Sequence, residues 1–301
     1  MIARAPGKLV LSGAYSVLEG SPALVTAVDR YVIADSSRVA EWLTPEVTAA
    51  KLRSRPWFDA SALRTEGRKI GLGSSAAILV ASLAADLLES GEIGDVRRLA
   101  DNVVERAMAA HAAIQPLGSG IDVIASCFGG TLVTKRVQAS MSHAPVTLPE
   151  DVYFEVWSAP YAQSTHDMLA TLRRFESNHP SLYSRRIAEQ AAAAEQTFEA
   201  LEARQGPLFV ASLARQEIAL DALGRDAAMP IVTEELRLLA ERAATESAAV
   251  LPAGAGGGDV TIFAGIRPPS NELRDLMLRL QHARLDLSLS ARGVHSIDKK
   301  C

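Results

Sequence analysis

The chain has 301 residues, of which 48% are hydrophobic and 22% charged, and its formal net charge is −4. This length suffices for one large domain or for two of about 150 residues. The mild acidity, and the lack of a Lys/Arg block with interleaved aromatic residues, argue against nucleic acid as a partner. The two cysteines, Cys127 and Cys301, offer neither a disulfide framework nor the spacing of metal ligands.

The first twenty residues, MIARAPGKLVLSGAYSVLEG, do not resemble a cleaved signal. Their apolar run is short, is broken by Gly13 and lacks a small-residue cleavage pattern. No apolar run in the sequence reaches the length needed to cross a bilayer. We therefore expect a soluble cytoplasmic protein that has no membrane partner.

Strands and helices are both predicted in the first half of the chain. Residues 9–34 are rich in β-forming residues, with the turn EGSP between two apolar runs, and residues 35–68 are polar and irregular. Helices are expected from residue 75 to about 89 and from 95 to about 111. The turn QPLGSGID then leads into a short helix and a strand.

A change in composition near residue 148 predicts a domain boundary, which gives domains 1–148 and 149–301. Residues 165–250 are Ala- and Leu-rich and predict helices parted by NHPS, RQGP and DAAMP. A loop, a strand, a helix and a closing strand, LDLSLSAR, complete the chain. Strand–helix–strand after a block of helices predicts two α+β domains.

The stretch IGLGSSAA at 70–77 stands directly before an apolar helix. Its glycines allow positive φ and a close approach of the backbone to a ligand. Ser74 or Ser75 can cap the first turn, whose unpaired N–H groups and dipole attract anions. An ordinary tight turn with an N-cap explains these eight residues equally well.

Two more glycine-containing segments make the ordinary turn a weaker explanation: APGKLVLSGAY at 5–15 and PAGAGGGD at 252–259. Residues 253–258 are only Gly or Ala, so they cannot form a core but can approach a backbone or a substrate closely. A flexible linker is the alternative, and it conflicts with the strong strand VTIFAG that follows.

These segments carry the residue types that phosphoryl transfer needs, which are phosphate-binding N–H groups, a cation and a carboxylate. Lys8 lies in a glycine-preceded turn, and Asp122 lies in GSGID at the entrance of an apolar helix. Asp122 alone is explained as a helix-start carboxylate that the dipole favours. Together with Lys8 and GLGSSAA, it becomes a candidate base.

The motifs APGK, GLGSSAA, GSGID and PAGAGGGD, in this order over residues 5–259, resemble those of the GHMP kinase superfamily. The resemblance implies an N-terminal domain like domain 2 of ribosomal protein S5 and a ferredoxin-like C-terminal α+β domain. It also implies that GLGSSAA is the phosphate-binding loop, that ATP and Mg²⁺ are used, and that the enzyme is a monomer or homodimer.

Within the superfamily, several details resemble phosphomevalonate kinases. A Gly-x-Tyr in SGAYSVLEG replaces the Gly-Glu-His of mevalonate kinases, and Lys69 stands two residues before GLGSS. SAPYAQSTHDML resembles the Ser/Thr-rich segment of that branch. Mevalonate kinases carry a magnesium-binding glutamate eleven residues before the catalytic aspartate, whereas this chain has His111 there. The lysine at position 8 disfavours the related decarboxylases.

The resemblance assigns Lys8 and Asp122 as catalytic residues and Ser75 as a metal ligand. The nucleotide would be held by Gly71, Leu72, Gly73, Ser74, Ser75 and Ala76. The acceptor would be held by Lys69, Ser119, Gly120, Ser164, Thr165, His166, Gly254, Ala255, Gly256 and Gly257. For Lys69 and residues 164–166, an ordinary polar loop is almost as good an explanation.

We therefore expect an ATP-dependent kinase that converts 5-phosphomevalonate into 5-diphosphomevalonate. A mevalonate kinase or another GHMP kinase is the alternative within enzymes. A catalytically inactive binding homologue is the alternative outside them, and the presence of both Lys8 and Asp122 counts against it.

Overall fold

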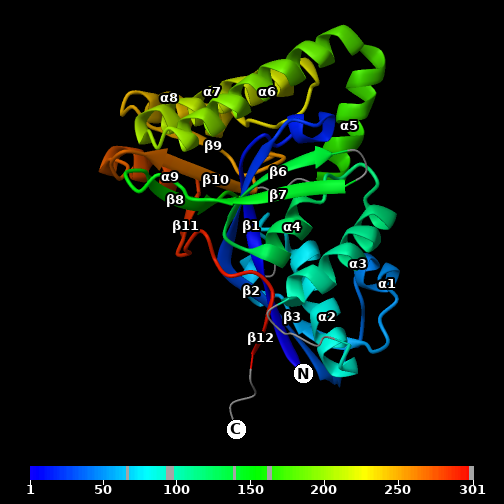
Figure 1. Cartoon of the computed structure of the whole chain (residues 1–301). Helices are drawn as coiled ribbons and strands as arrows, with labels where there is room; N and C mark the ends of the chain where they lie inside the picture. Colours follow the sequence, from blue (N-terminus) through cyan, green and yellow to red (C-terminus); the bar gives the residue numbers. More distant parts are fainter. Residues whose placement is uncertain (66–67, 93–97, 138–139, 161–164, 298–301) are drawn as a thin grey trace. The chain divides into compact units, whose positions relative to one another are not determined.

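A computed structural model of the chain describes residues 1–65, 68–92, 98–137, 140–160 and 165–297 (Figure 1). The chain forms two compact units, each built from separate stretches: residues 1–9, 25–132 and 287–301 in the first, and residues 10–24 and 133–286 in the second. The strands β1 (Ile2–Ser12) and β2 (Ala23–Val39) each contribute to both units. These units do not coincide with the predicted domains 1–148 and 149–301. That division into domains stays a prediction.

The strands form two main sheets and a short hairpin. The six-stranded sheet has the order β12-β1-β2-β6-β7, with β3 paired to β2. The four-stranded sheet is antiparallel, with the order β11-β8-β10-β9. The bounds of these strands are β3 (Pro56–Asp59), β6 (Thr131–Val137), β7 (Ser140–Val146), β8 (Tyr153–Ser158), β9 (Ala249–Pro252), β10 (Val260–Gly265), β11 (Ala283–Leu285) and β12 (His295–Ile297), and the hairpin joins β4 (Arg64–Thr65) to β5 (Arg68–Lys69).

Helices α2 (Ser74–Ser90), α3 (Leu99–Ile114) and α4 (Ile121–Phe128) pack on one another in the first unit (Figure 1). The α2 sequence ILVASLAADLL is apolar around most of its circumference, which is typical of an enclosed helix. Accordingly, it is buried from Ala76 to Leu88. The predicted second helix is confirmed as α3, which continues past residue 111; its predicted start lies among residues 93–97, outside the described residues.

The region predicted to be irregular, residues 35–68, contains more regular structure than expected. Strand β2 continues to Val39, a short helix α1 (Pro45–Ala49) starts behind the capping residue Thr44, and β3 pairs with β2. A single 3-10 turn, η2 (Ser61–Leu63), follows. These elements are short, so tertiary pairing rather than periodicity defines them, and the prediction was wrong here.

The predicted closing strand LDLSLSAR does not form as one strand. Strand β11 ends at Leu285, and isolated bridges then join Leu289 to Val28 and Arg292 to Gly129 before β12. Alternating apolar residues predict a strand, but a strand also needs one partner along its length. Here the backbone bonds go to successive parts of the first unit, including Gly130 and Ala27.

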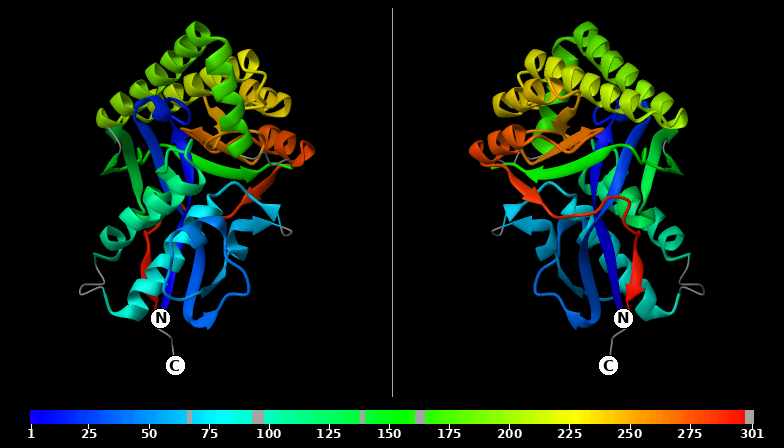
Figure 2. Two further views of the ribbon diagram at one scale, coloured as in Figure 1. Left: turned by 90° about the vertical axis from the view of Figure 1, so that its right-hand side faces the viewer. Right: turned by 90° about the vertical axis from the view of Figure 1, so that its left-hand side faces the viewer.

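The second unit contains the block of helices. Figures 1 and 2 show α6 (Pro180–Glu202) and α7 (Gly206–Asp226) side by side, and α7 and α8 (Glu234–Ala244) pack on β9. The remaining elements of this unit are α5 (Thr165–Asn178), α9 (Asn271–Arg279) and the 3-10 turn η1 (Ser16–Glu19). The predicted breaks at NHPS, RQGP and DAAMP are confirmed. Within the described residues, no helix combines the length and the apolar character that a membrane span requires.

Glu217 is a buried carboxylate on α7, with only 8% of its surface exposed. Burial is the main cause that raises its pKa to about 7, and the nearby carboxylate of Asp221 adds to the shift. The Arg237 guanidinium opposes it. Because the folded pKa lies above the unfolded value, the stability present below about pH 4.5 is lost as the pH rises through about 7.

Glu217→Gln should therefore stabilise the protein at pH 8 by about 1–3 kcal/mol and change stability little at pH 4.5. Urea denaturation at both pH values measures the difference. Glu199→Gln, at an exposed position of α6, is the matched control and should behave like the parent protein. An equal effect of Glu217→Gln at the two pH values would show that the carboxylate does not titrate as described.

Candidate active site

The GLGSSAA segment forms a tight loop that ends in the first turn of α2. Gly71 and Gly73 have φ of 71° and 74°, the left-handed region that their lack of a side chain permits. Gly73 is the N-cap, and no side chain caps the helix. The prediction that Ser74 or Ser75 caps it was wrong, because the helix begins at Ser74 itself. No side-chain cap therefore occupies the first-turn N–H groups, which can donate to a backbone carbonyl or to a ligand.

Lys8 lies directly against this loop. Its backbone N–H donates to the carbonyl of Leu72 at 2.9 Å. A Cβ on Gly73 would lie 3.0 Å from Lys8 Cε and 3.1 Å from Cγ, so the lysine side chain runs along the glycine. A Cβ on Gly7 would lie 2.8 Å from the Leu72 oxygen. Two glycines from two motifs therefore allow the lysine-bearing strand to touch the loop.

Asp122 occupies the first turn of α4, after Gly120 at φ 78°. Its Oδ1 accepts the backbone N–H of Val123 at 3.0 Å, so part of the carboxylate is held by its own helix. One turn later, the buried hydroxyl of Ser126 donates to the Pro6 carbonyl at 2.8 Å. The helix that carries Asp122 is thereby joined to the strand that carries Lys8.

Ser126 was not predicted as part of the site. In the sequence it is one small polar residue in the apolar run IDVIASCF, four positions after Asp122. Its helical spacing from Asp122 was the available signal. Its partner, Pro6, lies 120 positions away, and no local pattern indicates that pairing.

The turn before Asp122 packs on α3. A Cβ on Gly120 would come within 2.5 Å of Met108 Cε, and one on Gly118 within 3.0 Å of His111 Nε2. The imidazole of His111 is 4% exposed, and its Nδ1 has no hydrogen-bond partner among the described residues. Ser119 is half-buried, and its hydroxyl accepts the Ile121 N–H at 3.5 Å. Met108 and His111 of α3 therefore pack directly against the turn that precedes Asp122.

Lys69, at the end of β5, lies beside the phosphate loop. Its Nζ donates to the Ser75 hydroxyl at 3.5 Å. The side chain is exposed and long enough to reach either the loop or a bound anion. This places a second cation of the first unit next to the start of α2.

The glycine-rich segment 253–258 belongs to the second unit and connects β9 to β10. Gly254, Gly256, Gly257 and Gly258 have φ between 80° and 105°. Gly257 N–H donates to the Ile231 carbonyl at 3.2 Å, and a Cβ on Gly256 would overlap that carbonyl. The predicted close approach to another backbone is confirmed for this loop.

Of the predicted segment 164–166, Ser164 lies outside the described residues. Thr165 and His166 begin α5 in the second unit, and both are exposed. Their role in binding an acceptor phosphate, together with Lys69, stays a prediction.

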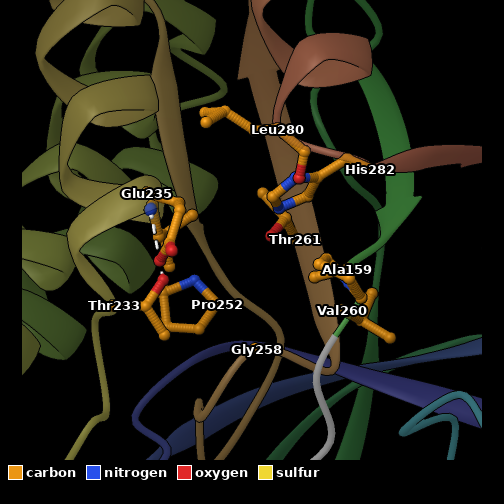
Figure 3. A pocket seen from close by; sticks show the side chains of 11 residues that line it. Ala159, Thr233, Glu235, Pro252, Gly258, Val260, Thr261, Leu280 and His282 are labelled. Carbon is orange, nitrogen blue, oxygen red and sulfur yellow. Dashed lines mark hydrogen bonds between the residues drawn. The ribbon is translucent and has the colours of Figure 1, made fainter.

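A small cavity of about 10 Å³, the room of one water molecule, adjoins the glycine-rich loop at Gly258. Figure 3 shows His282 and Thr261 on one side of it and Thr233 and Glu235 on the other. Burial lowers the pKa of His282 below its usual value, so the imidazole stays neutral at pH 7. The cavity is too small for a nucleotide or a phosphorylated acceptor.

The described residues contain no cluster of three or more His, Cys, Asp or Glu side chains suited to hold a metal ion. Mg²⁺ in phosphoryl-transfer sites needs few protein ligands, because substrate phosphates and water complete its shell. The hydroxyl of Ser75 at the start of α2 fits this mode, with Asp122 as a carboxylate of the same unit.

Several proteins that are similar to this chain in sequence or fold are named kinases. No family model matches the chain. The phosphomevalonate kinase of Streptomyces sp. (strain CL190) is 24% identical over 336 aligned positions, which cover 87% of this chain and 89% of that one. The mevalonate kinase of Archaeoglobus fulgidus is 30% identical over 203 positions, which cover 60% and 66%. The chain is a GHMP-type kinase.

Solved structures agree with the predicted two-domain α+β fold of this kinase superfamily. Streptococcus pneumoniae phosphomevalonate kinase in complex with phosphomevalonate and AMPPNP superposes with a TM-score of 0.78 at 19% identity, covering 96% of this chain and 99% of that chain. Methanococcus jannaschii mevalonate kinase gives 0.70 at 16% identity, covering 99% and 98%. Both relatives are named as kinases of mevalonate or phosphomevalonate, and the Streptococcus structure holds AMPPNP.

Replacing Gly73 by Ala tests the contact between the loop and Lys8. The added methyl strains a residue at positive φ and displaces the lysine side chain. We expect the affinity for AMPPNP with Mg²⁺, measured by calorimetry, to fall at least about tenfold, which corresponds to about 1.4 kcal/mol.

Gly91→Ala at the other end of α2 is the matched control. Gly91 has φ 70°, but a Cβ there meets nothing within 4 Å. This variant carries similar backbone strain and should keep the parent affinity. Equal losses in both variants would mean that strain in α2, and not the loop, weakens nucleotide binding.

Proposed function

We propose that this kinase transfers the γ-phosphoryl group of ATP to the phosphate of 5-phosphomevalonate, which yields 5-diphosphomevalonate and ADP. The observation that carries the transfer chemistry is the packing of Lys8 along Gly73 at the uncapped start of α2. Similarity to the Streptomyces phosphomevalonate kinase extends over 87% of the chain, against 60% for the Archaeoglobus mevalonate kinase, and this supports the acceptor.

In this proposal the donor phosphates lie over residues 71–76. The backbone N–H groups of the first turn and the helix dipole bind their negative charge. The lysine at position 8 lies beside the same loop and neutralises charge on the transferred group, which spreads over three oxygens in the transition state. Bound Mg²⁺ would be held by Ser75 and would supply further charge neutralisation between the phosphates.

Asp122 acts on the acceptor. An acceptor phosphate with a second pKa near 6 is largely deprotonated at pH 7, so its attacking oxygen already carries charge. The carboxylate then removes the remaining proton where one is present and otherwise orients the acceptor. The hydrogen bond from the Ser126 hydroxyl to the Pro6 carbonyl fixes α4 to the strand that carries Lys8, and this holds Asp122 in a constant position relative to that strand.

The acceptor is doubly charged, so its own phosphate needs a cation and several donors besides those that bind ATP. We assign Lys69, Ser164, Thr165 and His166 to this phosphate. The rest of the acceptor is assigned to Ser119, Gly120, Gly254, Ala255, Gly256 and Gly257. The same proposal places the enzyme in the cytoplasm, as a monomer or homodimer. A mevalonate kinase is the second candidate, favoured by the 30% identity to the Archaeoglobus enzyme.

Lys69→Ala separates the two candidates. If Lys69 binds the phosphate of the acceptor in the ground state, its loss should raise the KM for 5-phosphomevalonate at least about tenfold and change the KM for ATP less than about twofold. ADP release with 5-phosphomevalonate or free mevalonate as acceptor measures both constants.

Lys135→Ala is the matched control, because it removes an exposed lysine from β6 with the same change of charge. It should leave both constants unchanged. Turnover of free mevalonate as fast as phosphomevalonate, with Lys69→Ala affecting neither, would contradict the acceptor assignment. The broader kinase assignment would then stand without it.

A further inference from the structure

Tyr15 contacts the glycine-rich loop of the second unit from a point 240 residues away in the sequence. Its hydroxyl donates to the carbonyl of Ala255 at 2.5 Å. The ring is 1% exposed, and burial raises the pKa of the phenol above its usual value, so the hydroxyl keeps its proton throughout the physiological range. A carbonyl oxygen can only accept, so the tyrosine is the donor.

Residues 253–258 have no side chain larger than a methyl group. Any polar recognition by this loop must therefore come from backbone N–H and C=O groups. The described chain has no cis peptide bond, and in a trans peptide the C=O and N–H point in opposite directions. Holding the Ala255 carbonyl toward Tyr15 thus directs the Gly256 N–H away from Tyr15.

Among the described residues, hydrogen bonds at a few points restrict the glycines of this loop. Four of its residues are glycines at positive φ, a conformation with little intrinsic preference over its alternatives. Ala253 N–H donates to the Val260 carbonyl at 2.9 Å, and Gly257 N–H donates to the Ile231 carbonyl at 3.2 Å. The hydroxyl of Tyr15 is the side-chain contact that fixes the peptide between these two points.

The residues directly before Tyr15 are held by buried polar side chains of α6 and α7. Gln216 Oε1 on α7 accepts the Ser12 hydroxyl at 3.0 Å and the Gly13 N–H at 3.3 Å. The amide of Gln216 donates to Gln190 on α6. All of these side chains are buried, so the start of the Ser12–Tyr15 segment is fixed to the helix pair.

We propose that Tyr15 is a positioning residue that sets the peptide orientation of residues 253–258 for binding the phosphorylated acceptor. This inference rests on the proposed function, which assigns Gly254, Ala255, Gly256 and Gly257 to the acceptor. Tyr15 acts through the Ala255 carbonyl, and the glycine N–H groups that it orients bind the acceptor's anionic group.

The test compares the parent enzyme with Tyr15→Phe, which keeps the buried ring and removes only the hydroxyl. Without the acceptor, hydrogen exchange of the Gly257 amide, which donates to the Ile231 carbonyl, should become faster in the variant, because the loop loses one of its anchors. The KM for the acceptor should rise about fivefold to thirtyfold, the effect of one lost buried hydrogen bond. The KM for ATP should stay within about twofold of the parent value.

Tyr31→Phe is the matched control. Its hydroxyl also donates to a backbone carbonyl, that of Arg292 at 3.0 Å, but in the first unit. It removes the same atom from the same kind of bond and should change neither the exchange of loop 253–258 nor the KM for the acceptor.

Three outcomes overturn the inference: unchanged exchange of the loop in Tyr15→Phe, an unchanged KM for the acceptor, or an equal rise in the KM for ATP. A measurement on the parent enzyme keeps the test open if Tyr15→Phe does not fold. The acceptor should then slow exchange of the Gly256 and Gly258 amides, and no slowing would overturn the inference.

Failure of the proposed function has a different signature. If the parent enzyme turns over free mevalonate and not 5-phosphomevalonate, the acceptor assignment fails. The role of Tyr15 is then judged by the exchange of the loop and by the KM for mevalonate.

Discussion

The hydrogen bond from Lys8 N–H to the Leu72 carbonyl is the contact on which the candidate site depends. It fixes the middle of β1 against the loop that opens α2. The two segments could not come so close if Gly7 or Gly73 had a side chain, because a Cβ at either position would meet atoms of the other segment. The lysine is therefore held beside the N-terminus of α2. A phosphate bound there would interact favourably with both the lysine charge and the helix dipole.

A second hydrogen bond, from the Ser126 hydroxyl to the Pro6 carbonyl, joins the helix that carries Asp122 to β1. The C-terminal segment supports this helix from its other end, since Val294 N–H donates to the Ser126 and Cys127 carbonyls at 3.0 Å. Two segments distant in the sequence thus fix one short helix. In the second unit, the glycine-rich loop is likewise held at defined backbone points and is not a free linker.

Local sequence was sufficient to predict some parts of this structure. The helices of residues 165–250 and their Pro- and Gly-marked breaks follow from composition, and the burial of α2 follows from its apolar run. The order of the four motifs indicated the superfamily and, through it, the fold. Positive φ at Gly71 and Gly73 followed from residue type alone, since glycine tolerates this conformation without strain.

What the sequence did not predict depends on distant partners. The alternation in LDLSLSAR suggested a strand, but several different segments receive its backbone bonds. Ser74 and Ser75 looked like helix caps, but the left-handed Gly73 takes the N-cap position. The hydrogen bonds of Tyr15 and Ser126 could not be predicted, because their partners lie 240 and 120 residues away. Tertiary contacts, not periodicity, define these features.

A crystal structure of the enzyme with AMPPNP and Mg²⁺ tests most directly whether the start of α2 and Lys8 form the phosphate site. The β- and γ-phosphate oxygens should lie within about 3.5 Å of backbone N–H groups in residues 71–76 and of Lys8 Nζ. Phosphates bound elsewhere in the chain, with this loop and Lys8 left without contact to them, would contradict the assignment.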